Sequence, residues 1–251
     1  MPSLQAYQYR MPAGFAGDLQ RAEAAVIEPQ IIDPAAPPAA FGLPVKMVSG
    51  KIQPINSASD VPNSVYGVNL RPYPIQGNGT DPLGTSTPPT SGVTDILKRG
   101  YVNILLGGST AAAKDGRVWV RVANANAGAG KPLGGFEAAP EYAVTAGTNT
   151  GNGTVGSISA GAAPASGSYS IKFTSATAFT VTAPYGTSLP PGVVGAAYAN
   201  PQINFTITAG GTAFVAGDSF TIGNNLILLP KRWYFMGPAD AYGITELAVD
   251  N

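Results

Sequence analysis

The sequence predicts an all-β protein, and three observations carry this fold class. Apolar residues alternate with polar ones in short runs, as at Tyr169, Ile171 and Phe173. A period of two is the signal of a half-buried strand. Turn-forming residues separate these runs, with 32 Gly and 23 Pro in 251 residues. Apolar residues make up 44% of the chain, so a core can be buried between many turns.

The composition limits the chemistry that the chain can perform. It has 14 basic and 14 acidic residues and a formal net charge of zero, which argues against nucleic-acid binding and against a polybasic membrane anchor. It has no Cys and no His, which removes disulfides, thiol nucleophiles, His-based triads and the usual zinc ligands. We therefore expect a protein that is not an enzyme, with no catalytic residues, no cofactor and no metal.

Residues 1–42 are predicted to form an extended N-terminal arm. Pro29, Pro34 and Pro38 bias the chain toward extended or polyproline geometry, although residues 18–26 are compatible with a short helix. Apolar side chains lie between the prolines, so we expect the arm to become ordered on a neighbouring subunit; a disordered tail is the alternative. The contact candidates in this arm are Phe15, Ile31, Ile32 and Phe41.

Residues 43–143 predict the first part of a jelly-roll-like β-sandwich, which residues 229–251 complete. Strands are expected where apolar residues alternate, most clearly over 117–122, and one helical turn is possible over 93–99. Residues 71–91 form a long Pro-rich loop, and loops of this length in compact domains are usually functional or flexible. Two further contact candidates lie in this loop, Tyr73 and Ile75.

Residues 144–228 are predicted to form a small, outward-facing β domain inserted into this base. Its short alternating runs are separated by turn residues such as Asn152-Gly153. Lys172 and Asp218 are the only charged residues between positions 143 and 229 of the sequence. A domain without a charged groove has little with which to perform acid–base or phosphate chemistry.

Two sets of segments resemble structural proteins of tailed-bacteriophage heads. The first resembles a Gly- and Thr-rich module that recurs in head-decoration proteins: GNGT at 151–154, GSYSI at 167–171, FTSAT at 173–177 and the run 203–218. The second is similar to the pattern of phage structural cement proteins: VYGV at 65–68, RPYP at 71–74, TPPTSG at 87–92, LKRGY at 97–101, GGFEAA at 134–139 and GPADA at 237–241. In cement proteins a short stretch separates the last two segments. Here the Gly- and Thr-rich module separates them, which indicates an insertion.

The resemblance implies a cement or decoration protein that binds the outer surface of a phage capsid. Such a protein stabilises the capsid by bridging adjacent major capsid protein subunits, here as a homo-oligomer, dimer or trimer, in the virion. No basic segment followed by an apolar core opens the chain, so we expect no signal peptide, no membrane partner and assembly in the bacterial host cytoplasm. The alternative is a phage-borne receptor- or sugar-binding module of a tail or fibre, which would need exposed aromatic residues on the inserted domain.

Three other motifs would fit different functions, and each also has a structural interpretation. The GAGK segment at 128–131 resembles part of a phosphate loop, but Ala125 stands where the first Gly belongs and Pro132 replaces the Ser or Thr. Glu137 and Glu141 would fit a glycosidase pair, although solvated surface charges are the commoner use of such residues. Four aromatic residues would fit a ligand platform but are more often core or subunit interface: Trp119, Trp233, Tyr234 and Phe235.

Overall fold

The computed structural model describes residues 14–72 and 87–251 and confirms the predicted all-β fold class. Within these ranges the regular elements are strands and four short 3-10 helices, η1 to η4. None of the helices in the described ranges is long and apolar enough to cross a membrane. The chain divides into two compact units, which we describe separately: unit 1 comprises Met1–Ala139 and Leu229–Asn251, and unit 2 comprises Pro140–Leu228.

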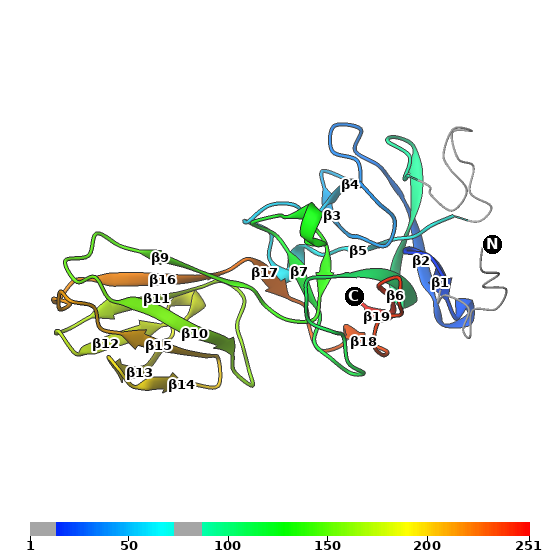
Figure 1. Ribbon diagram of the computed structural model, residues 1–251. Helices are drawn as coiled ribbons and strands as arrows, with labels where there is room; N and C mark the ends of the chain where they lie inside the picture. Colours follow the sequence, from blue (N-terminus) through cyan, green and yellow to red (C-terminus); the bar gives the residue numbers. More distant parts are fainter. Residues whose placement is uncertain (1–13, 73–86) are drawn as a thin grey trace, which may run out of the picture. The chain divides into compact units, whose positions relative to one another are not determined.

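Unit 1 is organised around one long strand, β6 (Val93–Gly107) (Figure 1). Four strands pair with it antiparallel and one parallel: β1 (Leu19–Gln20), β2 (Val26–Ile31), β5 (Gly67–Asn69), β19 (Ile244–Asp250) and the parallel β8 (Phe136–Glu137). Four further strands extend this sheet at its margins: β3 (Pro44–Val48), β4 (Lys51–Pro54), β7 (Trp119–Arg121) and β18 (Tyr234–Phe235). Three 3-10 helices lie in the connections: η1 (Ala22–Ala24), η2 (Pro62–Ser64) and η3 (Ala127–Ala129).

Two segments that the sequence leaves open to a helical interpretation are instead parts of this sheet, which corrects that interpretation. Residues 18–26 form β1, the 3-10 helix η1 and the start of β2, while residues 93–99 form the start of β6. Residues 93–99 include the β-branched Val93, Thr94 and Ile96, and the two segments pair with each other, since Val26 lies opposite Arg99. Pairing between residues far apart in the sequence overrides the weak local helix preference. Part of the expected N-terminal arm therefore lies in the protein's own sheet.

β6 contains a β-bulge at Lys98, between the part of the strand that pairs with β5 and the part that pairs with β19. Val26 lies opposite Arg99 and Ile27 opposite Leu97, so Lys98 is an extra residue on β6. The extra residue shifts the alternation of side chains along β6 by one position. The face of β6 that is buried before Lys98 is therefore opposite to the face that is buried after it. Lys98 itself is held by Tyr66: its Nζ lies 3.5 Å from the ring centroid and donates a hydrogen bond to the Tyr66 carbonyl at 2.5 Å.

A buried ion pair fixes β7 against β8. The Arg121 side chain is fully buried and its guanidinium makes two bonds to the Glu137 carboxylate, Nε to Oε1 at 2.6 Å and Nη2 to Oε2 at 3.1 Å. Nη1 donates to the carbonyl of Asn124 at 3.1 Å. Because Glu137 is engaged in this pair, it is not a free carboxylic acid for sugar hydrolysis.

Unit 2 is a sandwich of two antiparallel sheets (Figure 1). The five-stranded sheet has the order β13 (Ser188–Val193), β12 (Ala178–Thr182), β11 (Ser168–Phe173), β16 (Ser219–Asn224) and β9 (Tyr142–Ala146). The three-stranded sheet has the order β10 (Thr154–Ala160), β15 (Ile203–Thr208) and β14 (Ala197–Ala199). The 3-10 helix η4 (Pro184–Gly186) joins β12 to β13, and β17 (Leu226–Leu228) ends the unit.

The core of unit 2 consists of the residues that alternate in the sequence. Tyr169, Ile171 and Phe173 of β11 are buried, while the residues between them are exposed. Ile203 and Phe205 face the same core from β15. The two sheets therefore contribute every second residue to one interior, as the period of two predicts.

Asp218 closes one end of this sandwich by accepting three backbone hydrogen bonds. Its Oδ1 accepts from the Thr150 N–H at 2.9 Å, and its Oδ2 accepts from Gly151 at 2.9 Å and Val215 at 3.1 Å. Hydrogen bonding, most strongly from Thr150, lowers the pKa of Asp218 although burial acts in the opposite direction. This carboxylate therefore ties a loop of the unit to the hairpin that precedes β16.

Candidate functional site

The six contact candidates from the sequence fall into three groups in the structure. Phe15 and Ile31 are exposed, with 51% and 53% of their surface accessible. Ile32 and Phe41 are buried, and Tyr73 and Ile75 lie outside the described residues. Of the six candidates, only Phe15 and Ile31 are therefore exposed among the described residues and available to touch another molecule.

The expectation for Ile32 and Phe41 is corrected because both side chains belong to the protein's own interior. Ile32 packs in a cluster with Val45, Ile52 and Ile96. Phe41 packs against Gly17, where a Cβ atom would approach the Phe41 Cβ to 2.6 Å. Hydrophobicity alone could not distinguish these residues from Ile31, because the choice between core and surface depends on which face of the chain meets the sheet.

Phe15 is exposed but held in place. Its backbone N–H donates to the Asp18 carboxylate at 2.7 Å, and the Arg71 guanidinium lies over its ring at 4.6 Å from the centroid. Gly17 donates to the Asn103 carbonyl of β6 at 2.7 Å. The segment that carries Phe15 is thus attached to the sheet of unit 1.

A contiguous exposed apolar surface lies where β2 pairs with the start of β6. Ile27, Pro29 and Ile31 share one face of β2, and Val93 lies directly opposite Ile31. The exposed fraction is 38% for Ile27, 53% for Ile31 and 61% for Val93. We call these four residues the apolar face. Asp95, which lies opposite Pro29, is on the same side of the sheet.

The backbone edge of β2 is poorly suited to pairing with another strand. Ile32 donates to the Gly92 carbonyl at 2.9 Å, so alternate residues from Ile32 backward direct their backbone groups toward β6. Pro29 lies in the other set, whose backbone groups point away from β6, and it has no N–H to donate. Proline on an exposed edge hinders strand addition. The side chains of the apolar face, and not the backbone edge of β2, are therefore what this place offers to another molecule.

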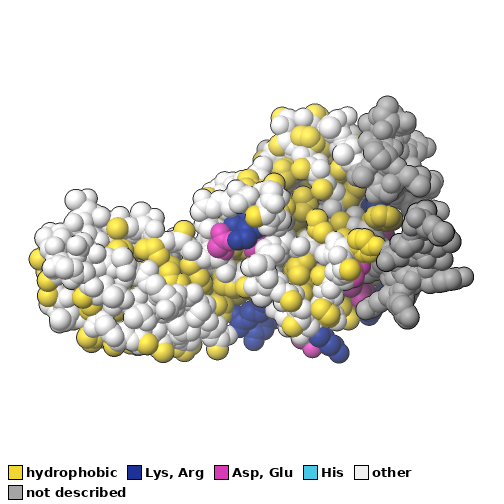
Figure 2. Space-filling view, viewed as in Figure 1, with side chains coloured by type: hydrophobic (Ala, Val, Ile, Leu, Met, Phe, Trp, Pro, Cys, Tyr) yellow, Lys and Arg dark blue, Asp and Glu magenta, His cyan; other side chains and the backbone are white. Residues whose placement is uncertain are grey.

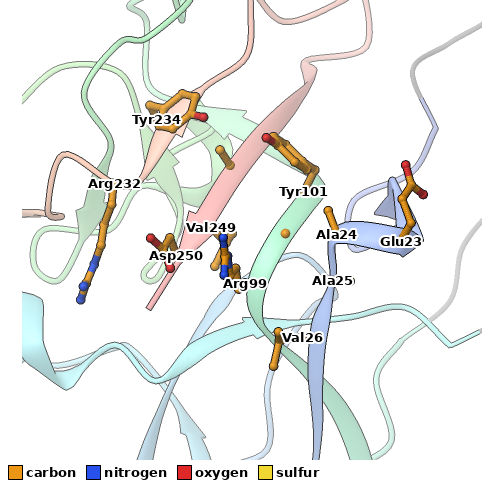
Figure 3. Close-up of a pocket in the computed structure, with 12 residues that line it drawn as sticks. Glu23, Ala24, Ala25, Val26, Arg99, Tyr101, Arg232, Tyr234, Val249 and Asp250 are labelled. Carbon is orange, nitrogen blue, oxygen red and sulfur yellow. The ribbon is translucent and has the colours of Figure 1, made fainter.

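A second surface feature of unit 1 is a depression of about 500 Å³ between the start of β2, β6 and β19 (Figure 3). Tyr101 and Tyr234 point toward each other at one end of it (Figure 3). The Arg21 guanidinium lies over the Tyr101 ring at 4.2 Å from the centroid and bonds Glu246 at 3.1 Å. Burial is the largest cause of a raised pKa at Tyr234. Tyrosine and arginine are enriched in protein interfaces, so the depression fits an interface margin.

The other motifs from the sequence are structural where they are described. The segment 128–131 follows a cap in which the Asn126 side chain accepts from the Ala129 N–H at 3.2 Å, and Lys131 exchanges backbone hydrogen bonds with Asn126. Trp119, Trp233 and Phe235 are buried. In the described ranges, no group of three or more His, Cys, Asp or Glu residues could hold a metal ion.

The sequence alone did not identify four residues as part of a contact surface: Ile27, Pro29, Val93 and Asp95. The signal that could have found the first two is a run of β-branched residues interrupted by one proline, which is typical of an edge strand. Val93 and Asp95 could not be assigned in this way, because their neighbours on the sheet come from β2 and not from adjacent positions.

Comparison with solved structures finds matches that include two crystal structures of Xanthomonas campestris FlgL, each with a TM-score of 0.30. The first shares 28% sequence identity and covers 35% of this chain and 29% of that chain. The second shares 18% identity and covers 79% of this chain and 46% of that chain. At this TM-score the likeness carries no argument on fold or function, and the match spans less than half of each FlgL chain.

A search of curated proteins finds no match. A protein-family model described as XM1 gp53 minor capsid protein matches residues 4–183, which is more than half of the chain. The matched region contains the apolar face, the segment of Phe15 and the first strands of unit 2. The chain therefore belongs to the XM1 gp53 family of phage minor capsid proteins and has a structural role in the capsid.

Proposed function

We propose that the protein is a cement or decoration protein on the outer surface of the phage capsid, where it bridges adjacent major capsid protein subunits without performing catalysis. The observation that carries this proposal is the apolar face of β2 and β6, exposed in a chain from a capsid protein family. Large contiguous apolar patches are rare on the surface of soluble monomers, and where they occur they mark interaction sites. For a protein of the capsid, the neighbouring capsid subunits are the nearest surfaces available to cover this apolar face.

The mechanism is additive burial of surface at many equivalent positions. Each buried apolar square ångström contributes about 25 cal/mol, and a stable protein interface buries roughly 1,200 to 2,000 Å². A protein that binds the assembled shell and not its separated subunits stabilises the shell by mass action. Phe15 and the depression of unit 1 would widen the contact beyond the apolar face.

Unit 2 fits the role of an inserted domain that faces solvent. It contains only three of the chain's charged residues, Glu141, Lys172 and Asp218. The face over strands β12 to β15 seen in Figure 2 is almost entirely apolar atoms and uncharged polar atoms. Its core is complete within its own two sheets, so docking need not be coupled to its folding.

Binding to empty shells tests this function. Capsids assembled without the protein should bind the purified protein to saturation, in a fixed ratio to the major capsid protein, and should then rupture at a higher temperature. The isolated major capsid protein should bind it much more weakly. A protein that is found only on tails, or that leaves the rupture temperature unchanged at saturation, would contradict the proposal.

One observation favours the alternative of a receptor- or sugar-binding module. Tyr185, in η4 of unit 2, is 83% exposed and has a φ of 67°, a left-handed conformation that is uncommon for an aromatic residue. An aromatic ring held out in this way could stack on a sugar. Tyr198 of β14 is buried and donates to the Pro190 carbonyl, so its ring is not presented in the same way. Binding of the isolated protein to host cells, lost in Tyr185→Ser, would support this alternative.

A further inference from the structure

Asp95 places a negative charge in the middle of the apolar face. It lies opposite Pro29 and two residues from Val93 along β6, with Ile27 and Ile31 on either side of Pro29. The side chain is exposed, and no hydrogen bond or ion pair to it is found in the described ranges. Among residues 14–72 and 87–251, the carboxylate therefore has no hydrogen-bonding or ion-pair partner.

The backbone holds Asp95 at a defined position. Its carbonyl accepts a hydrogen bond from the Leu70 N–H at 2.9 Å, and β6 pairs with β2 on one side and β5 on the other. A strand that is paired along both edges moves little, so the charge is presented at a fixed point. Aspartate is also disfavoured within strands, which means that local β propensity does not explain its presence here.

The charge restricts what can cover the apolar face. A purely apolar partner would bury the carboxylate without a counter-charge, and an unpaired buried charge is strongly unfavourable. A second copy docked through the same face around a twofold axis would bring two Asp95 carboxylates together, and like charges are unfavourable there. Nucleic-acid phosphates would be repelled for the same reason. A protein surface that combines apolar side chains with a basic one satisfies both requirements.

We propose that the apolar face docks on a patch of the major capsid protein in which apolar side chains surround one Lys or Arg, and that this cation pairs with Asp95. This inference rests on the proposed function and specifies the chemistry of its partner. Ile27, Ile31 and Val93 supply the buried area, and Asp95 sets orientation and selects the correct patch of the shell. Pro29 hinders the competing mode, addition of a capsid strand to the edge of β2.

Binding of charge variants to shells assembled without the protein tests this proposal. Asp95→Asn keeps the shape and removes the charge; it should bind at least about tenfold more weakly and with a smaller dependence on salt. Asp95→Lys should bind more weakly still. Asp115→Asn, which removes an exposed acid elsewhere in unit 1, is the matched control and should bind like the unaltered protein. Thermal melting of each variant verifies that folding is unchanged.

Val93→Ser separates this inference from the proposed function. If Val93→Ser weakens binding and Asp95→Asn does not, the face docks but recognises no cation, and the inference is overturned while the cement function stands. If neither variant changes affinity, docking occurs elsewhere and the inference is also overturned. If the unaltered protein does not bind shells, both are overturned. A Lys→Glu or Arg→Glu change in the capsid protein that restores binding of Asp95→Lys would support the inference most strongly.

Discussion

The two units of the protein bury their apolar residues in different ways. In unit 2 the alternating residues of β11 and β15 all turn inward, and both sheets close over one core. In unit 1 the strand β2 directs Ile27 and Ile31 outward, and β6 adds Val93 to the same surface. The difference indicates that unit 2 is complete by itself, whereas unit 1 has apolar surface that an assembly partner can bury.

The largest expected effect on stability comes from opening the core of unit 2. Phe173 stacks on Phe214 with ring centroids 4.0 Å apart and also contacts Phe179 and Phe220. Phe173→Ala should lower the free energy of unfolding of this unit by about 3 to 5 kcal/mol, because it removes buried area and leaves a cavity. Denaturant unfolding, followed through the signal of one backbone amide in each unit, measures this change in the free energy of unfolding. An equal shift in unit 1 would mean that the two units do not unfold separately.

A smaller effect is expected from acid, and it should act on unit 2 through Asp218. Its pKa is lowered in the folded state, so the stabilising contribution is complete above the unfolded value, near pH 4, and is lost as the pH falls through the folded pKa. Asp218→Asn should therefore flatten the loss of stability of unit 2 below pH 4. Melting curves of both proteins between pH 2 and 6 test this, and identical pH profiles would contradict the assignment.

The smallest effect on stability, and a large effect on binding, is expected at the apolar face. Ile31→Ser changes a side chain that is 53% exposed, so the free energy of unfolding should change by no more than about 0.5 kcal/mol. Affinity for shells should nevertheless fall, because apolar area is lost from the interface. Val193→Ser is a matched control, since Val193 is 55% exposed on unit 2. Equal loss of binding in both variants would remove the distinction between the units.

The sequence predicted the parts of the fold that depend on local periodicity. The strands of unit 2 could be located because their period of two is encoded in neighbouring positions such as Tyr169, Ile171 and Phe173. The pairing of β2 with β6 could not be found in this way, because it depends on residues more than sixty positions apart. The contact of Lys98 with Tyr66 likewise joins residues that are distant in the sequence.

The candidate site was predicted only in part for the same reason. Phe15 and Ile31 are exposed as the contact hypothesis requires, while Ile32 and Phe41 turn into the core. Consecutive residues of a strand face opposite sides, so Ile31 and Ile32 could not both have the same role once β2 joined the sheet. Asp95 became a candidate only when its neighbours across the strands were known.

Imaging of intact particles at residue resolution tests the central claim most directly. We expect density for this protein on the outer surface of the capsid, with Ile27, Ile31 and Val93 covered by the major capsid protein and a Lys or Arg of that protein within hydrogen-bonding distance of Asp95. Unit 2 should project into solvent. Particles in which the apolar face is open to solvent, or in which the protein occupies the tail instead of the shell, would contradict the account.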